Sequence, residues 1–322
     1  MVEWSDKSMK LAKTSEALIK RKKGLTKSEL QLYSLCAIPV LLVFVFNYIP
    51  LFGILIAFKD YRYNLGIFGS KWVGIENFTF FFTSSDFYRI TWNTLSMNFV
   101  FIVFGTICSV LVATLLFHLR SRNATKVFQT ILITPHFLSW VVVAYMAFAF
   151  LNPTYGFLNA ILGIFGIPAV DWYSEPGAWP YILTFFNIWK HVGMDSVLYY
   201  ACLMGIDTGL FEAADIDGAN SVHKFWKIIV PELTSLLVLQ TILKIGGIFR
   251  ADFGLFYQLP RNIGVLYSTT DVIDTYVFRA MREIGDMSMS SAIGLLQSIV
   301  GFILVLTTNF VTNKISPQNA LF

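Results

Sequence analysis

Two apolar segments of the chain carry polar side chains of the kinds that bind saccharides. The first segment contains Asn187, Trp189, Lys190, His191, Asp195 and Tyr199, and the second contains Gln240, Lys244, Arg250 and Asp252. Sugars are held by hydrogen-bonding side chains and by aromatic faces, and these segments supply both. We therefore predict that these residues line the path of a polar substrate such as a saccharide. The excess of Lys190, Lys244 and Arg250 suggests an acidic saccharide, such as a uronate oligomer, for example alginate.

The same side chains also allow a purely structural interpretation. Lys190 with Asp195, and Arg250 with Asp252, have the charges of compensated pairs, and either pair can lie near the water interface. An ionisable group inside a bilayer is costly, so it is either paired or functional. At this stage both interpretations stay open.

The sequence offers no signature of catalysis or of a bound cofactor. The three cysteines have no C-x-x-C spacing, and the four histidines have no metal-ligand spacing. No phosphate-binding loop of the form G-x-x-x-x-G-K-[S/T] occurs, and Asp252-Phe253-Gly254 lacks the motifs that accompany it in kinases. We expect this chain to hold no cofactor and to catalyse no reaction.

Composition places the chain in a membrane. Of its 322 residues 56% are hydrophobic and only 14% are charged, against about 25% charged residues in soluble domains. A span needs about 20 apolar residues, and lipid excludes open strands, so we predict an all-α membrane protein with six transmembrane helices. The predicted spans are Tyr33–Phe58, Thr91–Phe117, Val127–Leu151, Trp179–Met204, Leu236–Phe256 and Ser288–Val311.

Lysine and arginine set the expected orientation. The tail before the first span is basic, and the short loop after the second span holds Arg120, Arg122 and Lys126. By the positive-inside rule both termini then face the cytosol. The expected organisation is a basic tail over residues 1–30, a first span with an external loop over 31–90, a five-helix core over 91–312, and a cytosolic tail over 313–322.

A polar insert, residues 205–235, separates the fourth and fifth predicted spans on the cytosolic side. Asp207 is positioned to cap a short helix, and Gly218 permits a tight bend with positive φ. Asn220 is positioned to cap a second helix, which Pro231 is expected to end. The insert is therefore expected to form two short helices joined by a turn, which project into the cytosol.

This insert resembles the EAA loop of binding-protein-dependent ABC importer permeases, through Glu212-Ala213-Ala214, Gly218-Ala219, Phe225, Ile228 and Pro231. Other parts of the chain are similar to the sugar-importing branch, which includes maltose-type permeases and permeases for oligosaccharides or polysaccharides. The stretches that carry this similarity are Ile56–Tyr61, Val73–Phe78, Thr91–Thr94 and Thr270–Tyr276. The maltose-type archetype has extra spans and a large external domain, which this chain lacks.

The resemblance implies a function and a set of partners. The loop would form a coupling helix that sits in a cleft of a cytosolic ATPase, so that ATP and Mg²⁺ would bind to partner subunits only. The partners would be a second, related permease chain, two ATP-binding subunits and an extracytoplasmic solute-binding protein. Transport would proceed by alternating access. The residues assigned to coupling are Glu212, Ala213, Ala214, Asp215, Asp217, Gly218, Ala219, Phe225 and Pro231.

Two other classes of protein compete with this interpretation. An ion-driven secondary sugar transporter would usually show internal repeats and broken spans, and no convincing repeat is visible in the sequence. A membrane-embedded glycosyltransferase would need clustered carboxylates in an aqueous loop. Asp271 and Asp274 are the nearest to such a cluster, and no metal-binding spacing accompanies them.

Overall fold

The computed structural model describes residues 27–119 and 121–320, which form two compact units that meet between Ile54 and Leu55. Most of the predicted basic tail, up to residue 26, lies outside the described residues, and so do the last two residues of the C-terminal tail. The first unit consists of the helix α2 (Lys27–Val43), a π-helical turn η1 (Phe44–Tyr48) and the start of the 3₁₀ helix η2 (Ile49–Phe58).

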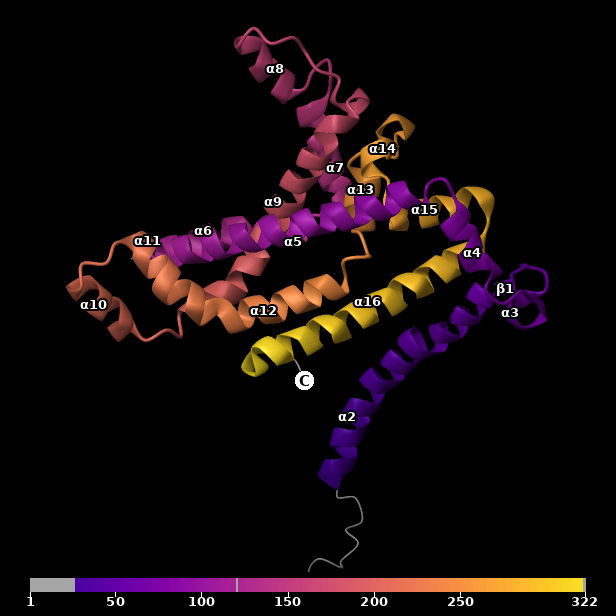
Figure 1. The fold of residues 1–322 in the computed structure, drawn as a ribbon, viewed down its shortest axis with the longest axis horizontal. Helices are drawn as coiled ribbons and strands as arrows, with labels where there is room; N and C mark the ends of the chain where they lie inside the picture. The colour runs from indigo at the N-terminus through magenta and orange to yellow at the C-terminus, as the bar shows by residue number, and fades with distance from the viewer. Residues whose placement is uncertain (1–26, 120, 321–322) are drawn as a thin grey trace, which may run out of the picture. The chain divides into compact units, whose positions relative to one another are not determined.

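The second unit is built on four long helices, which Figure 1 shows as its main body: α5 (Phe87–Phe117), α9 (Trp179–Leu203), α12 (Val230–Gly246) and α16 (Met287–Ile315). A sharply bent pair, α6 (Arg122–Ile133) and α7 (Trp140–Leu151), is joined by the 3₁₀ turn η3 (Thr134–Phe137). Over the described part of the chain, four helices are long and apolar enough to cross a membrane, or up to six if each of two bent pairs is one span.

Two of the predicted spans are not single straight helices. The third is broken by a bend of 100° between residues 137 and 140. The fifth was expected to run to Phe256, which is wrong, because α12 ends at Gly246 and the next helix, α13 (Phe253–Gln258), begins seven residues later. Two consecutive glycines, Gly246 and Gly247, have low helix propensity, and they favour the end of the helix at this point.

The expectation that Pro231 ends the second limb of the insert is also wrong. A single helical segment runs from Ser221 to Gly246, as α11 (Ser221–Lys224), the π-helical turn η6 (Phe225–Ile229) and α12. A proline inside a helix normally clashes with the carbonyl four residues earlier, which here lies in the wider π turn. The turn η1 precedes Pro50 in the same way. The π turns therefore let both helices continue through proline.

Helix packing in the second unit relies on glycine at close crossings. Gly246 of α12 and Gly301 of α16 face one another, and a Cβ atom at either would collide with the other helix. Figure 1 shows α16 running beside α12. Small residues at such crossings let helix backbones approach closely, which is how helices associate where no water is available to drive burial.

The end of the second unit at the start of α16 is built from short elements. They are the paired strands β1 (Lys59–Asp60) and β2 (Lys71–Trp72), α3 (Gly66–Gly69), α4 (Glu76–Thr83), α15 (Ile273–Arg279) and the π turn η8 (Ala280–Ile284). The Asn77 amide donates to the carbonyls of Ala57 and Lys59 at 2.9 and 3.0 Å. The Asn93 amide donates to the carbonyl of Asp271 at 3.0 Å. The four sequence stretches that resemble sugar permeases therefore meet at this one end.

A buried ion cluster ties this end together. Asp271 is 1% exposed, and its carboxylate accepts from Arg279 at 2.7 Å and from Arg89 at 3.1 Å. Both of its oxygens are occupied by guanidinium groups, and Thr275 adds a hydrogen bond at 2.9 Å. Asp271 and Asp274 therefore take part in structural contacts rather than forming a free catalytic pair.

We expect Asp271→Asn to lower the thermal stability of the purified protein markedly. Removing one partner of a buried ion pair strands the other charge, which costs about 3–5 kcal/mol. Asp60→Asn is the matched control, because Asp60 pairs with Arg62 at 3.2 Å on the exposed hairpin, where such pairs contribute only about 0–1 kcal/mol. Thermal unfolding in detergent measures both variants, and equal unfolding temperatures would contradict the prediction.

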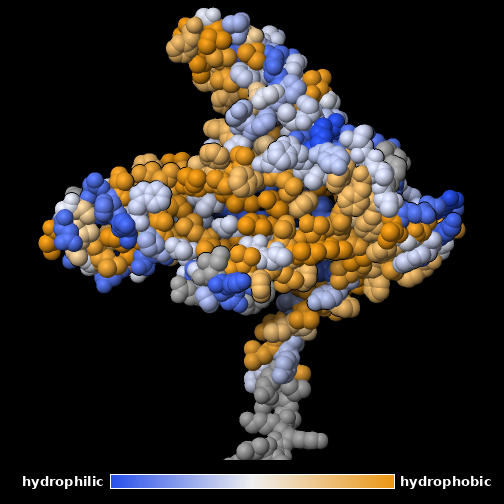
Figure 2. Space-filling view, in the orientation of Figure 1, coloured by the Kyte–Doolittle hydropathy of each residue, from blue (hydrophilic) through white to orange (hydrophobic). Residues whose placement is uncertain are grey.

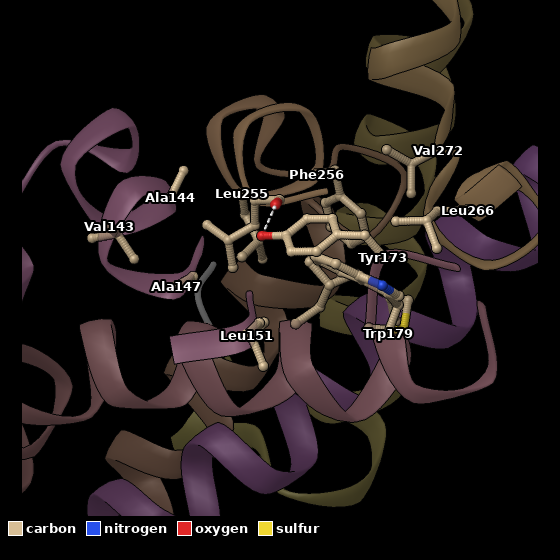
Figure 3. Close-up of a cluster of buried hydrophobic side chains, with 13 residues drawn as sticks. Val143, Ala144, Ala147, Leu151, Tyr173, Trp179, Leu255, Phe256, Leu266 and Val272 are labelled. Carbon is tan, nitrogen blue, oxygen red and sulfur yellow. Dashed lines mark hydrogen bonds between the residues drawn. The ribbon is translucent and has the colours of Figure 1, made fainter. Parts of the chain in front are cut away.

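The remaining elements of the second unit are short. They are α8 (Phe157–Ile164), η4 (Trp172–Ser174), η5 (Pro176–Ala178), α10 (Thr208–Ile216), η7 (Gly264–Leu266), α14 (Tyr267–Thr270) and η9 (Pro317–Asn319). Figure 3 shows the largest buried cluster, where Tyr173 and Trp179 pack with Leu255, Phe256 and Leu266. This cluster packs α7, α9 and α13 against one another.

Polar and apolar surfaces separate along the second unit. Figure 2 shows apolar residues over the long helices and hydrophilic residues at two opposite ends, one formed by α10 and α11 and the other by the strands and α3. The C-terminal turn η9 lies beside the start of α12, where Ser235 donates to Asn319 at 2.7 Å. The insert and the C-terminal turn are therefore at the same end of this unit.

Candidate functional site

A cavity of about 280 Å³ lies among α5, α9 and α12, in the middle of the long helices. Asn187, His191 and Asp195 are spaced by four residues, so they share one face of α9. Asn98, Gly105 and Ser109, which are seven and four residues apart, share a face of α5. The polar side chains that line the cavity are Asn98, Ser109, Asn187, His191, Asp195 and Lys244. Four of the predicted substrate-path residues are thus brought together.

The cavity contains one ion pair. Lys244 of α12 donates to Asp195 of α9 at 2.9 Å, and the two side chains are 28% and 33% exposed. A charge pair on helices this apolar is costly unless both charges are matched or reach water, and here the pair meets both conditions. The cavity therefore presents amide, imidazole, carboxylate and ammonium groups, which together can bind hydroxyl and carboxylate groups of a ligand.

Asn98 is a functional candidate that the sequence reasoning missed. Its amide donates to the carbonyls of Ile248 at 2.8 Å and Arg250 at 3.1 Å, just beyond the end of α12. Nearby, Asp274 accepts from the Ala251 amide at 2.7 Å, and burial raises the pKa of this carboxyl above its usual range. An asparagine directly before the apolar run of α5 was the available signal, because buried amides require partners.

Lys190, which was also assigned to the substrate path, is engaged elsewhere. Its ammonium group donates to the carbonyls of Pro135 at 3.3 Å, His136 at 2.8 Å and Leu138, all within the bend between α6 and α7. It also lies 5.2 Å from the centre of the Trp140 ring. The side chain is buried and supplies donors to a stretch of chain whose carbonyls are freed by the bend.

Trp140 connects this bend to α13. Its indole donates to Asp252 at 2.7 Å, and Asp252 caps α13 by accepting from the Leu255 amide at 3.3 Å. A Cβ atom at Gly254 would collide with the Trp140 ring, so α13 sits directly on it. Asp252 is therefore held in this contact and does not pair with Arg250.

The other predicted path residues are dispersed. Trp189 lines an apolar groove beside α7 and α8, and Tyr199 is buried in a cluster of α5, α9 and α12. Arg250 donates to Ser298 at 2.7 Å. Gln240 lies half-buried on α12. None of these four lines the cavity in the part of the chain that the structure describes.

The first limb of the insert is the expected short helix, α10, whereas the second limb is the start of the helical segment that continues to Gly246. Asp207 caps α10 by accepting from the Gly209 amide at 2.9 Å, and Asn220 caps α11 by accepting from the His223 amide at 2.8 Å. Gly218 has φ +71° between them. An ion pair from Lys224 to Asp215 joins the two limbs. The caps and the glycine turn were predicted correctly from the residue types.

The insert is attached to the bundle on one face and open on the other. The ring centres of Phe211 in α10 and Phe117 in α5 are 5.5 Å apart, and Phe225 packs in the same cluster. Ile216 is 88% exposed, and Glu212, Ala213, Asp215, Asp217 and Gly218 are also exposed, whereas Ala214 and Ala219 are partly covered. Pro231 is exposed at the start of α12. An isoleucine surrounded by acidic residues on a projecting turn is a surface on which another protein can dock.

Comparison with known proteins decides the family. No protein-family model matches the chain. Protein LplB of Bacillus subtilis is 33% identical over 289 residues, which cover 89% of this chain and 90% of LplB. The polygalacturonan/rhamnogalacturonan transport system permease protein YteP of the same organism is 33% identical, over 93% of each chain. The chain belongs to the sugar ABC importer permeases. As such it is a multi-pass transport protein of the cytoplasmic membrane.

Solved structures agree with this assignment. A chain of a bacterial alginate ABC transporter, crystallised with a periplasmic protein that holds an alginate pentasaccharide, matches the permease with a TM-score of 0.80 and 29% identity. The match covers 90% of this chain and 96% of the other. A second structure, of an importer of the acidic polysaccharide alginate, matches with a TM-score of 0.81. Because these relatives are ABC importer permeases, the alternative of an ion-driven secondary transporter is not retained.

Proposed function

We propose that this permease, paired with a second permease chain, carries an acidic oligosaccharide or polysaccharide across the cytoplasmic membrane. An extracytoplasmic binding protein delivers the substrate, and two cytosolic ATP-binding subunits drive its passage. The observation that carries the proposal is the cavity among α5, α9 and α12, in which Asn98, Asn187 and His191 surround the Asp195–Lys244 ion pair.

The chemistry of the cavity suits a polar substrate that leaves its hydration shell. Amide and imidazole groups replace hydrogen bonds that sugar hydroxyls lose, and they are fixed on rigid helices. The Lys244 ammonium can exchange its partner Asp195 for a substrate carboxylate, and Asp195, whose side chain is 33% exposed, then loses its ion pair and is left to water. This exchange favours a uronate over a neutral sugar.

The proposed mechanism is alternating access driven through the insert. Glu212, Ala213, Asp217 and Ile216 form the surface that contacts the ATP-binding subunit. Because Phe211 and Phe225 attach the insert to α5, α9 and α12, a movement of the insert is passed to the helices that enclose the cavity. In this arrangement six spans place the insert and both termini in the cytosol.

The complete importer in proteoliposomes provides the test. We expect uptake of a galacturonate hexasaccharide to require both ATP and the binding protein, and to exceed uptake of a neutral maltose-type hexasaccharide. Uptake that continues without ATP, or that an ion gradient alone supports, would contradict the proposal. Equal uptake of the neutral and acidic sugars would contradict its substrate class.

A further inference from the structure

A second polar pocket, of about 230 Å³, lies between α7 and the turn that follows α13. It is separate from the cavity described above and shares no lining residue with it. Its walls combine aromatic rings with amide and guanidinium groups: Tyr145, Phe148, Tyr257, Gln258, Arg261 and Asn262. Pockets for drug-sized ligands measure about 300–1,000 Å³, so this smaller pocket suits a smaller group, such as one sugar residue.

Arg261 presents a guanidinium group that is free to bind an anion. Its central carbon lies 4.3 Å from the centre of the Phe148 ring, which orients the planar group by a cation–π contact. Across residues 27–119 and 121–320 no carboxylate pairs with it. The planar guanidinium group of an arginine can donate two parallel hydrogen bonds to the two oxygens of a carboxylate. Among the described residues Arg261 is oriented and unpaired, so it is suited to bind a carboxylate in this way.

The backbone of this turn is held in an unfavourable conformation. Arg261 and Asn262 have φ of 57° and 52°, and among described residues no other non-glycine has a positive φ. Such a conformation costs about 1–2 kcal/mol per residue, and strain of this kind collects at functional sites. The backbone conformation of this turn therefore determines the direction in which the Arg261 side chain projects.

Two tyrosines fix the turn. Tyr267 donates to the Asn262 side chain at 2.9 Å, and Tyr173 donates to the Leu259 carbonyl at 3.4 Å, the bond drawn in Figure 3. Burial raises the pKa of the Tyr173 hydroxyl to about 12, against the opposing charge of Arg261, so the donor stays protonated. The pocket is thus preorganised on the buried cluster that joins α7, α9 and α13.

We propose that this pocket is a subsite for one uronate residue of the substrate, with Arg261 binding its carboxylate and Tyr145 contacting the face of its ring. Tyr145 is 70% exposed, so its ring is available to a ligand. Gln258 and Asn262 supply hydrogen bonds to hydroxyl groups. This assignment rests on the proposed function, because it requires an acidic saccharide as the substrate. The subsite would bind the saccharide before it enters the central cavity or after it leaves.

Binding without nucleotide tests the subsite directly. The probes are trigalacturonate and its fully methyl-esterified form, which keeps the sugar ring and removes the charge, with the complete importer in nanodiscs. We expect Arg261→Gln to weaken trigalacturonate binding by about tenfold, the lower range for a hydrogen bond to a charged group, and to leave the ester unaffected. Tyr145→Ala is expected to weaken both probes, because it removes ring contact rather than charge.

Arg282→Gln is the matched control, because Arg282 is also exposed and lies 5.8 Å from the Phe278 ring. An unchanged preference for the charged probe in Arg261→Gln would overturn the subsite, as would equal loss of both probes or an equal effect of Arg282→Gln. Loss of the preference in Lys244→Met alone would place the uronate in the central cavity instead. ATP-driven uptake is measured in a separate assay. The binding result therefore still tests the subsite if the proposed transport function fails.

Discussion

Gly218→Pro is expected to lower the stimulation of ATP hydrolysis by loaded binding protein strongly, while the importer still assembles. Gly218 has φ +71° and its amide donates to the Asp215 carbonyl at 3.1 Å. Proline fixes φ near −65° and has no amide hydrogen, so the end of α10 must change its path. Coupling between sites is typically worth about 1–3 kcal/mol, so stimulation should fall about 5- to 150-fold.

Gly166→Pro is a closely matched control for this variant. Gly166 has φ +72°, and its amide donates to the Gly163 carbonyl at 3.1 Å, just after α8. Both substitutions therefore impose the same local strain and remove the same type of hydrogen bond. Stimulated hydrolysis by the purified importer is the measurement. If Gly166→Pro loses as much stimulation as Gly218→Pro, general destabilisation and not the insert explains the effect.

The fold was predictable where local chemistry decides it. Asp207 and Asn220 are good capping residues in front of helices, and Gly218 is the residue type that accepts positive φ. The helix starts and the turn of the insert could therefore be predicted from the sequence. The path through Pro231 was not predictable from propensity. It depends on the π turn Phe225–Ile229, which the packing of the helix against its neighbours stabilises.

The candidate site was only partly predictable, for a physical reason. Polar residues in apolar helices can be counted from sequence, but the direction of each side chain depends on which helices pack together. Asn187, His191 and Asp195 lie on one face of α9 and line the cavity. Lys190 projects from another face of α9 and contacts the bend between α6 and α7. That bend is a tertiary feature, and its freed carbonyls are invisible in the sequence.

The bend itself is expected to depend on Lys190. Lys190→Met keeps the length of the side chain but removes the donor that the carbonyls of Pro135, His136 and Leu138 share. A buried polar group left without its partner costs about 1–3 kcal/mol, and several carbonyls are affected together. A Cβ at the nearby Gly193 would collide with the Leu132 carbonyl, so α9 has no room to shift and compensate.

We therefore expect Lys190→Met to lower the unfolding temperature of the purified permease clearly, along with its yield in the membrane. Lys244→Met is the matched control, because Lys244 is also a lysine of a long apolar helix but has a single partner, Asp195, and is 28% exposed. It should unfold close to the wild type yet lose uptake of acidic sugar, since its ammonium group lines the cavity. If Lys190→Met instead unfolds like the wild type and loses only uptake, Lys190 belongs to the substrate path and its contacts in the bend are secondary.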